Sequence, residues 1–282
     1  MPGRRPWQAS RSPRACGDGD RNLRLRPLAP HIDILGPYRV PWLPGERRVR
    51  VFVPRPLRLG VRLPVLYMFD GQNVFDDGPS FSGGWHLHQT AQGLAEHGHT
   101  MPVIVGIDHG GVQRINELSP FRCSVSTGQL YRLIGWMRQT LMPAIRRDYP
   151  VRDDVAGTAI GGSSLGGLAA LHTHFRHPDL FGAALVMSPS LWLARGKMFR
   201  DLETHKTPWT SRIYLDAGAH EHRIFRDCAR LATGLRARGY GDAGLLWRPD
   251  PQGRHQEAHW RRRAPGALQY LFAHAQGAER AA

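Results

Sequence analysis

The sequence lacks the features that mark secreted, disulfide-bonded and membrane proteins. Its 282 residues include only three cysteines, Cys16, Cys123 and Cys228, whose wide spacing matches neither a disulfide framework nor a zinc-ligand pattern. No apolar run approaches the ~18 residues that suggest a membrane helix. Residues 1–30 lack the apolar stretch of a secretory signal, and Arg4-Arg5 alone is no twin-arginine export signal. We therefore expect a cytoplasmic protein with reduced cysteines and no membrane partner.

Lysine and acidic residues are also scarce. Lys197 and Lys206 are the only lysines, and the 38 basic residues outnumber the 23 acidic ones to give a formal charge of +15. Such a charge raises the question of nucleic-acid binding. The arginines are dispersed, however, and no helix-turn-helix, zinc-finger or RNP-type pattern is present. We expect no nucleic-acid partner and a surface that favours anionic substrates.

The remaining sequence divides into a tail and one domain. Residues 1–30 are rich in arginine and have little periodic hydrophobicity, so we predict a disordered basic tail followed by a single domain over 31–282. Alternating residues at 49–53 predict an antiparallel edge strand. Compact apolar runs predict strands covered on both faces at 65–69, 103–107, 155–160, 183–187 and 213–215, and a further strand is expected at 245–247. Helical patterns occupy 85–97, 129–148, 165–175, 225–238 and 256–273, the last interrupted or bent at Pro265. This alternation predicts an α/β fold, a mainly parallel central sheet with helices on both faces.

A candidate nucleophile lies where a predicted strand meets a predicted helix. Gly162-Ser163-Ser164-Leu165-Gly166 fits the pattern G-x-S-x-G, which needs this strand-turn-helix context to be meaningful. Glycine neighbours allow the strained turn and close packing that such a serine requires. Because Leu165 begins the helix, its amide and the helix dipole would point to where an oxyanion forms. We predict Ser164 as the nucleophile of an α/β-hydrolase.

A serine nucleophile needs a base and an acid, which in this fold follow it in the order acid, then histidine. His255 lies in a loop just before the last predicted helix and is our candidate base. Glu221, in the loop after the strand at 213–215, is our first choice for the acid. Asp216, within the strand end, and Asp250, before the histidine, remain alternatives.

Four segments of the chain, in order, resemble the putative esterase family of α/β-hydrolases, which is similar to enterochelin esterases, S-formylglutathione hydrolases and carbohydrate acyl esterases. The segments are Tyr67-Met68-Phe69-Asp70-Gly71-Gln72-Asn73-Val74-Phe75, Gly161-Gly162-Ser163-Ser164-Leu165-Gly166-Gly167, Ser188-Pro189-Ser190-Leu191-Trp192 and Arg254-His255-Gln256-Glu257-Ala258-His259-Trp260. The resemblance covers roughly residues 31–273.

The resemblance implies roles for particular residues. It implies that the amide of Gln72 is a second oxyanion donor opposite Leu165, that Ser164, an acid near Glu221 and His255 form a triad, and that Trp192 lines an acyl or leaving-group pocket. The sequence differs from the family pattern at two places beside these residues. Arg254 precedes the histidine, where the family commonly has Gly-Gly-Glu or similar, and histidines flank Glu221 on both sides.

The predicted function is hydrolysis of a small-molecule carboxylic ester through an acyl-enzyme, with no metal and no cofactor. An acyltransferase would share that acyl-enzyme and remains an alternative. A metal-dependent hydrolase is a weaker alternative, since closely spaced histidine pairs occur but H-E-x-x-H does not. The Gly, Pro and Trp content of residues 76–85 and 192–209 suggests a pocket for a bulky or aromatic group.

Overall fold

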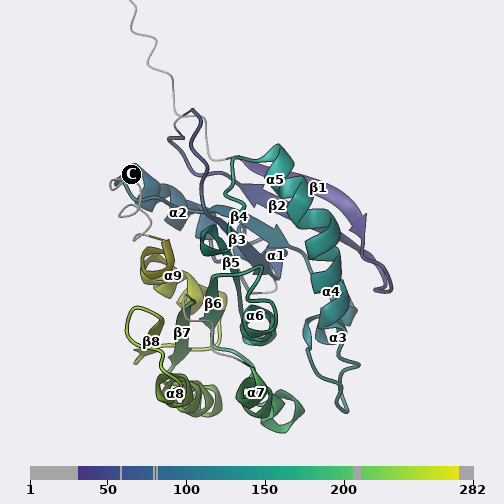
Figure 1. Cartoon of the computed structure of the whole chain (residues 1–282), viewed down its shortest axis with the longest axis vertical. Helices are drawn as coiled ribbons and strands as arrows, with labels where there is room; N and C mark the ends of the chain where they lie inside the picture. Colours follow the sequence, from purple (N-terminus) through teal and green to yellow (C-terminus); the bar gives the residue numbers. More distant parts are fainter. Residues whose placement is uncertain (1–30, 58, 79, 81, 206–210, 273–282) are drawn as a thin grey trace, which may run out of the picture.

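The computed structural model describes residues 31–57, 59–78, 80, 82–205 and 211–272, so the predicted tail at 1–30 lies outside the described residues. The described strands form one sheet of eight in the order β1-β2-β4-β3-β5-β6-β7-β8 (Figure 1). Along the chain these are β1 (Ile32–Arg39), β2 (Glu46–Phe52), β3 (Val65–Phe69), β4 (Val103–Ile107), β5 (Thr158–Ser163), β6 (Ala183–Met187), β7 (Arg212–Gly218) and β8 (Leu245–Asp250).

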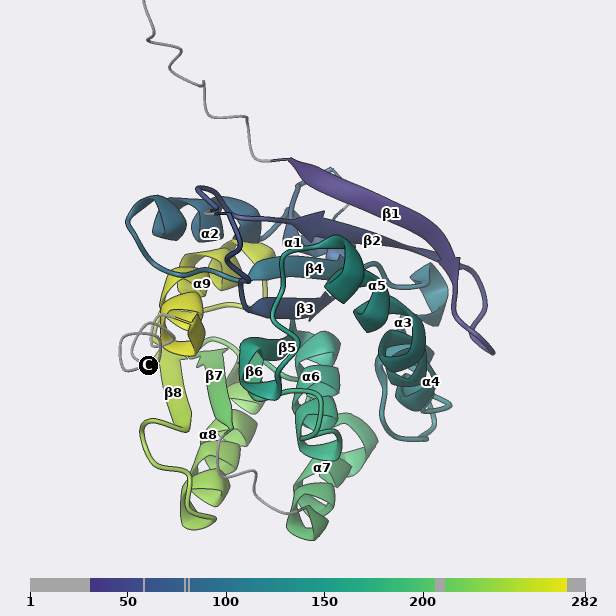
Figure 2. The ribbon, with the colours of Figure 1, turned by 45° about the horizontal axis from the view of Figure 1, so that its top comes forward.

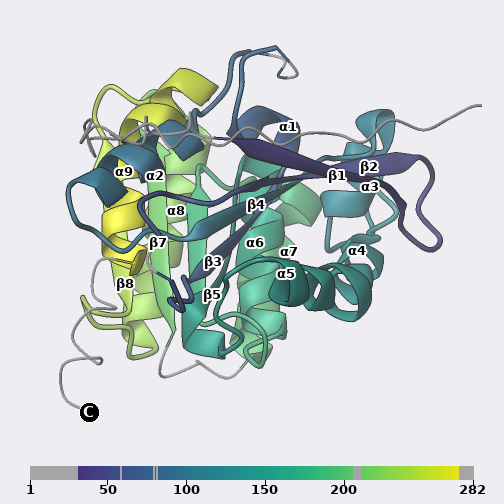
Figure 3. The same ribbon diagram turned by 90° about the horizontal axis from the view of Figure 1, so that it is seen from above.

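The sheet is mainly parallel, as predicted. Strands β4, β3, β5, β6, β7 and β8 pair in parallel, whereas β2 is antiparallel to both β1 and β4. The prediction of an edge strand at 49–53 is therefore wrong in one respect. The segment is antiparallel, but β1 pairs outside it, and Figure 3 shows the β1–β2 pair projecting at one end of the molecule.

Helices cover both faces of the sheet (Figure 2). They are α1 (Gly71–Val74), α2 (Leu87–Glu96), α3 (Arg114–Leu118), α4 (Leu130–Trp136), α5 (Met142–Asp148), α6 (Ser164–Arg176), α7 (Leu193–Thr204), α8 (His222–Ala237) and α9 (Glu257–Phe272). Buried residues of α1, α2 and α9 form the core on one face, and those of α3 to α8 form it on the other.

The pattern of β3 explains why both faces are covered. All five of its residues are buried. Val65, Tyr67 and Phe69 point into one core, and Leu66 and Met68 point into the other. A strand without a polar face cannot face water, so its hydrophobic burial drives the packing of helices on each side.

The start of β5 and the course of α9 differ from the sequence prediction. Residues 155–157 form a 3₁₀ turn, in which the Asp154 carboxylate accepts a hydrogen bond from the Gly157 amide at 2.8 Å, so β5 begins only at Thr158. The last helix continues through Pro265 and is not interrupted there. Within the described residues, no helix combines the length and apolar character needed to cross a lipid bilayer.

Candidate active site

Ser164 lies in the sharp turn between β5 and α6. Its φ of 54° is in the left-handed region, which is uncommon for a residue other than glycine. A Cβ on Gly162 would lie 2.6 Å from the carbonyl carbon of Gly166, so the strand and the helix could not approach this closely with a larger residue there. The turn therefore has the strained strand-turn-helix geometry that the G-x-S-x-G pattern predicted.

Ser164, His255 and Glu221 form a continuous line of hydrogen bonds. The Ser164 Oγ lies 2.9 Å from Nε2 of His255, and Nδ1 of the same ring lies 2.5 Å from Oε1 of Glu221. The Glu221 side chain is 1% exposed and that of His255 is 38% exposed, so the imidazole has a buried side and an open side. The residues come from three loops at the carboxyl edge of the sheet, after β5, β7 and β8.

The second oxygen of Glu221 is also occupied. Oε2 accepts hydrogen bonds from the amide of Gly218 at 2.6 Å and from the hydroxyl of Ser188 at 2.8 Å. Burial alone would raise the pKa of the Glu221 carboxyl. The hydrogen bonds from His255, Gly218 and Ser188 outweigh burial and hold this pKa below its ordinary value. Glu221 is thus ionised at neutral pH and faces His255 with one oxygen.

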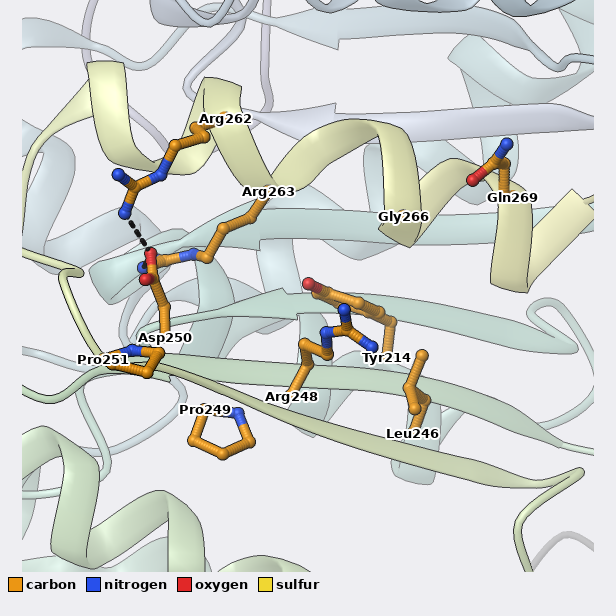
Figure 4. A pocket seen from close by; sticks show the side chains of 10 residues that line it. All are labelled: Tyr214, Leu246, Arg248, Pro249, Asp250, Pro251, Arg262, Arg263, Gly266 and Gln269. Carbon is orange, nitrogen blue, oxygen red and sulfur yellow. Dashed lines mark hydrogen bonds and ion pairs between the residues drawn. The ribbon is translucent and has the colours of Figure 1, made fainter.

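The other two candidate acids are paired with arginines instead. Asp216 is fully buried and forms an ion pair with Arg263 at 2.9 Å. Asp250 accepts a hydrogen bond from Arg262 at 2.7 Å and a longer one from Arg263 at 3.3 Å (Figure 4). Within the described residues, the carboxylate that contacts His255 belongs to Glu221.

The segment that contains Gln72 turns sharply after β3. Asp70 has a φ of 58° and precedes the short helix α1, of which Gln72 is the second residue. A Cβ on Gly71 would lie 2.5 Å from the backbone of Gly106, so this turn packs directly against β4. Like Leu165, the second residue of α6, Gln72 lies in the first turn of a helix, where amides have no acceptor within the helix.

Gln72, Ser164 and His255 line one pocket of about 630 Å³. The other side chains that line it are Asp70, Asn73, Ser80, Ser82, His109, Arg114, Ser163, Glu257 and Trp260. Arg114 is held there by Asp70, which accepts from its Nε at 2.6 Å and its Nη2 at 2.7 Å. The predicted segment 76–85 thus contributes to the pocket through Ser80 and Ser82.

Trp192 does not join this group in the described part of the chain. It lies 39% exposed beside a separate groove of about 250 Å³, formed by α7 and α8. The Arg223 guanidinium lies 5.7 Å from the centre of the Trp192 ring. The structure therefore places this tryptophan against a cationic groove rather than against Ser164.

Sequence reasoning missed the residues that surround Glu221 and His255. Ser188 and Trp260 occur in the segments that resemble the esterase family, but nothing in the sequence pointed to a role for them. Trp260 packs edge to face on the His255 ring at 5.0 Å between centroids, and its Nε1 donates to the Ser188 hydroxyl at 3.1 Å. Arg114 gave no signal because its partner, Asp70, is 44 residues away.

Two histidines of the closely spaced pairs contact carboxylates. His86 contacts Asp77 at 2.8 Å, and His172 lies 3.4 Å from Asp201. Among the described residues, no three histidine, cysteine, aspartate or glutamate side chains gather in a group that could hold a metal ion.

Comparison with known proteins identifies a family that matches most of the chain. The family model Esterase, described as "Putative esterase", matches residues 41–270. The iron(III) salmochelin esterase of Escherichia coli O6:H1 is 30% identical over 64% of this chain and 41% of its own length. The iron(III) enterobactin esterase of Dickeya dadantii is 25% identical over 81% of this chain and 55% of its own length. The chain spans about half the length of these curated relatives.

Solved structures show the same fold. The BES protein from Bacillus cereus superposes with a TM-score of 0.68 at 18% identity, over 86% of this chain and 94% of that one. The enterobactin esterase from Shigella flexneri, solved in the presence of 2,3-dihydroxy-N-benzoyl-serine, also gives 0.68, at 23% identity over 87% of this chain and 59% of that one. These likenesses establish an α/β-hydrolase fold.

Proposed function

The chain belongs to the Esterase family, and on that premise we propose that it is a serine esterase that hydrolyses a small-molecule carboxylic ester through an acyl-enzyme. The observation that carries the proposal is the line of hydrogen bonds from Ser164 through His255 to Glu221. A serine hydroxyl is a weak nucleophile unless an adjacent base removes its proton. Here the base is within reach of the hydroxyl, and a buried carboxylate holds the ring.

The proposed mechanism assigns each proton to an atom of this chain. Nε2 of His255 takes the Ser164 proton as Oγ attacks the ester carbonyl, and it then gives that proton to the departing alcohol. Glu221 keeps the ring oriented and stabilises its charged form. The amides of Gln72 and Leu165 donate to the oxyanion of the tetrahedral intermediate. Water, deprotonated by His255, then releases the acid and restores Ser164.

We place the substrate in the pocket that Ser164 shares with Arg114 and His109. Burial lowers the pKa of His109, so its ring is neutral at pH 7, and its Nδ1 accepts from the Gly111 amide at 3.0 Å. That bond leaves the Nε2 hydrogen of His109 available as a donor. Hydrogen-bond donors on this wall suit an ester with oxygen acceptors beside the scissile bond. The names of the relatives also favour an aromatic or anionic ester, and cytoplasmic location remains part of the proposal.

The experiment that tests the function compares wild type, Ser164→Ala and Ser190→Ala. Ser190 is the matched control, because its Oγ lies only 3.3 Å from that of Ser164, whereas the hydrogen bonds of His255 among the described residues go to Ser164 and Glu221. We expect wild type to hydrolyse short p-nitrophenyl esters with a chelator present, and Ser164→Ala to lose on the order of 10⁵-fold or more in turnover. An organophosphate should label Ser164 in wild type and in Ser190→Ala.

Other outcomes would overturn parts of the proposal. Full activity in Ser164→Ala would remove the serine mechanism, and loss of activity with the chelator would revive the metal-dependent alternative. Transfer of the acyl group to an added alcohol, in preference to water, would make the protein an acyltransferase, because both reactions share the acyl-enzyme. Product analysis by mass spectrometry distinguishes the two.

A further inference from the structure

Ser188 lies at the carboxyl edge of the sheet and has contacts that the mechanism above does not use. It follows β6, the strand between those that lead to Ser164 and to Glu221. Its side chain is fully buried, and its φ of 43° is in the left-handed region. For a residue other than glycine such a conformation costs about 1–2 kcal/mol. Glycine would relieve this strain, so the presence of serine indicates that its buried hydroxyl is needed.

The direction of the Ser188 hydroxyl is fixed by its partners. A hydroxyl has one hydrogen to donate and two lone pairs to accept. The Trp260 Nε1 and the Arg263 Nη2 lie 3.1 Å from it, and both groups can only donate. The Ser188 hydrogen must therefore point to the remaining partner, Oε2 of Glu221, at 2.8 Å. All three hydrogen-bonding positions of the hydroxyl are occupied.

A buried cation lies behind this hydroxyl. The Arg263 side chain is 5% exposed and is paired with Asp216 and Asp250. The Ser188 amide also faces Asp216, and lies 3.0 Å from its carbonyl oxygen. Hydrogen bonds in such a chain polarise one another, so donation from Arg263 strengthens the donation of the hydroxyl to Glu221.

We propose that Ser188 is a positioning residue, which relays the charge of Arg263 to Oε2 of Glu221 and so keeps Oε1 of this carboxylate directed at His255. The inference rests on the proposed function, in which Glu221 is the acid of the triad. A purely structural serine would stabilise the fold without affecting the protonation of the imidazole. The relay, in contrast, reduces the negative charge on Oε1 and thereby limits how strongly Glu221 favours the protonated ring.

The test uses two substitutions that remove the same hydroxyl. Ser188→Ala keeps the left-handed strain, whereas Ser188→Gly relieves it and guards against a variant that fails to fold. In both we expect kcat/KM for p-nitrophenyl acetate to fall by about 10-fold to 100-fold, the effect of losing a hydrogen bond to a charged group. The acid limb of the pH profile of kcat/KM should move to higher pH by a few tenths of a unit, because Glu221 becomes a stronger acceptor for His255.

Ser119→Ala is the matched control. Ser119 is also fully buried, and its hydroxyl donates to the carbonyl of Phe121 at 2.8 Å, away from the pocket. It should lower the thermal unfolding temperature without moving the pH profile. A second readout does not depend on turnover: the proton between His255 and Glu221 should change its NMR chemical shift in Ser188→Gly and not in Ser119→Ala.

Two results would overturn the inference. One is a folded Ser188→Gly protein with a kcat/KM within about threefold of wild type and an unmoved pH profile. The other is an unchanged chemical shift of the His255–Glu221 proton in that variant. Failure of the proposed function would look different, because an organophosphate would then fail to label Ser164 in wild type itself.

Discussion

Two glycines set the distance between the loop that carries Glu221 and the loop that carries His255. Gly218 ends β7, and its amide donates to Glu221 at 2.6 Å. Gly253, two residues before His255, accepts at its carbonyl from the His220 amide at 3.2 Å. A Cβ built on Gly218 would lie 2.2 Å from the carbonyl carbon of Gly253. We predict that Gly218→Ala drives the two loops apart and separates Glu221 from His255.

The size of the effect follows from that contact. Carbon atoms in van der Waals contact are about 3.5–4.0 Å apart, so the loops must separate by roughly 1.3–1.8 Å before an alanine fits. A misplacement of ~1 Å in a reacting constellation can cost about 100-fold in rate. Overpacking of this kind also destabilises a fold by about 1–3 kcal/mol. We therefore expect kcat/KM to fall far more than the free energy of unfolding would explain.

The assay measures kcat/KM for p-nitrophenyl acetate beside thermal unfolding, at temperatures where every variant is folded. Gly266→Ala is the matched control, because Gly266 lies within α9 and a Cβ there would have no neighbour within 4 Å. Alanine should stabilise that helix by about 0.5–1 kcal/mol and leave turnover unchanged. A Gly218→Ala protein with wild-type kcat/KM would refute the reasoning, since the loops would then not depend on this contact.

Two further predictions concern charge and pH. The substrate pocket contains Arg114, and the whole chain carries a formal charge of +15, so raising salt should raise KM for an anionic ester more than for a neutral one; equal effects on both esters would show that this positive charge does not attract the substrate. Burial lowers the pKa of His174 in the folded protein to about 4, below the ordinary ~6.5. As pH falls below ~6.5, the unfolded chain takes up a proton on His174, whereas the folded protein does so only near pH 4. This difference should lower the free energy of unfolding by about 2 kcal/mol between pH 7 and 4.5. Denaturant unfolding at both pH values should show a smaller drop in His174→Leu, and an identical drop would contradict the assignment to His174.

The strands that sequence predicted best are those with the strongest burial. The ranges 65–69, 103–107 and 183–187 match β3, β4 and β6 at both ends, and each of these strands is buried along its whole length. Strand β5 is equally buried, but its predicted range begins too early because Asp154 caps a 3₁₀ turn over residues 155–157. Strand β1 escaped prediction because it contains Gly36-Pro37 and buries none of its residues fully, so it has no apolar run. Edge strands of this kind form by pairing with a neighbour rather than by local preference.

Some residues of the candidate site could likewise be predicted from the sequence, and others could not. Ser164, Glu221 and His255 could be proposed because their order follows the order of strands and loops, and the structure brings the three into hydrogen-bond contact. The choice of Glu221 over Asp216 could not be made from sequence, since it depends on Arg263, 47 residues further along, which pairs with the aspartate. Trp192 was placed by resemblance alone, and the structure puts it beside another groove.

A single physical feature links the parts of this site that sequence could and could not reveal. Asp70, Ser164 and Ser188 follow the adjacent strands β3, β5 and β6, and each has a left-handed φ, at 58°, 54° and 43°. None is glycine, although glycine would adopt each turn without strain. The side chains explain why: one holds Arg114, one is the proposed nucleophile and one holds Glu221. At about 1–2 kcal/mol each, the three turns cost a substantial part of the 5–15 kcal/mol by which a domain is typically stable. The hydrophobic burial of the strands that lead into these turns offsets that cost.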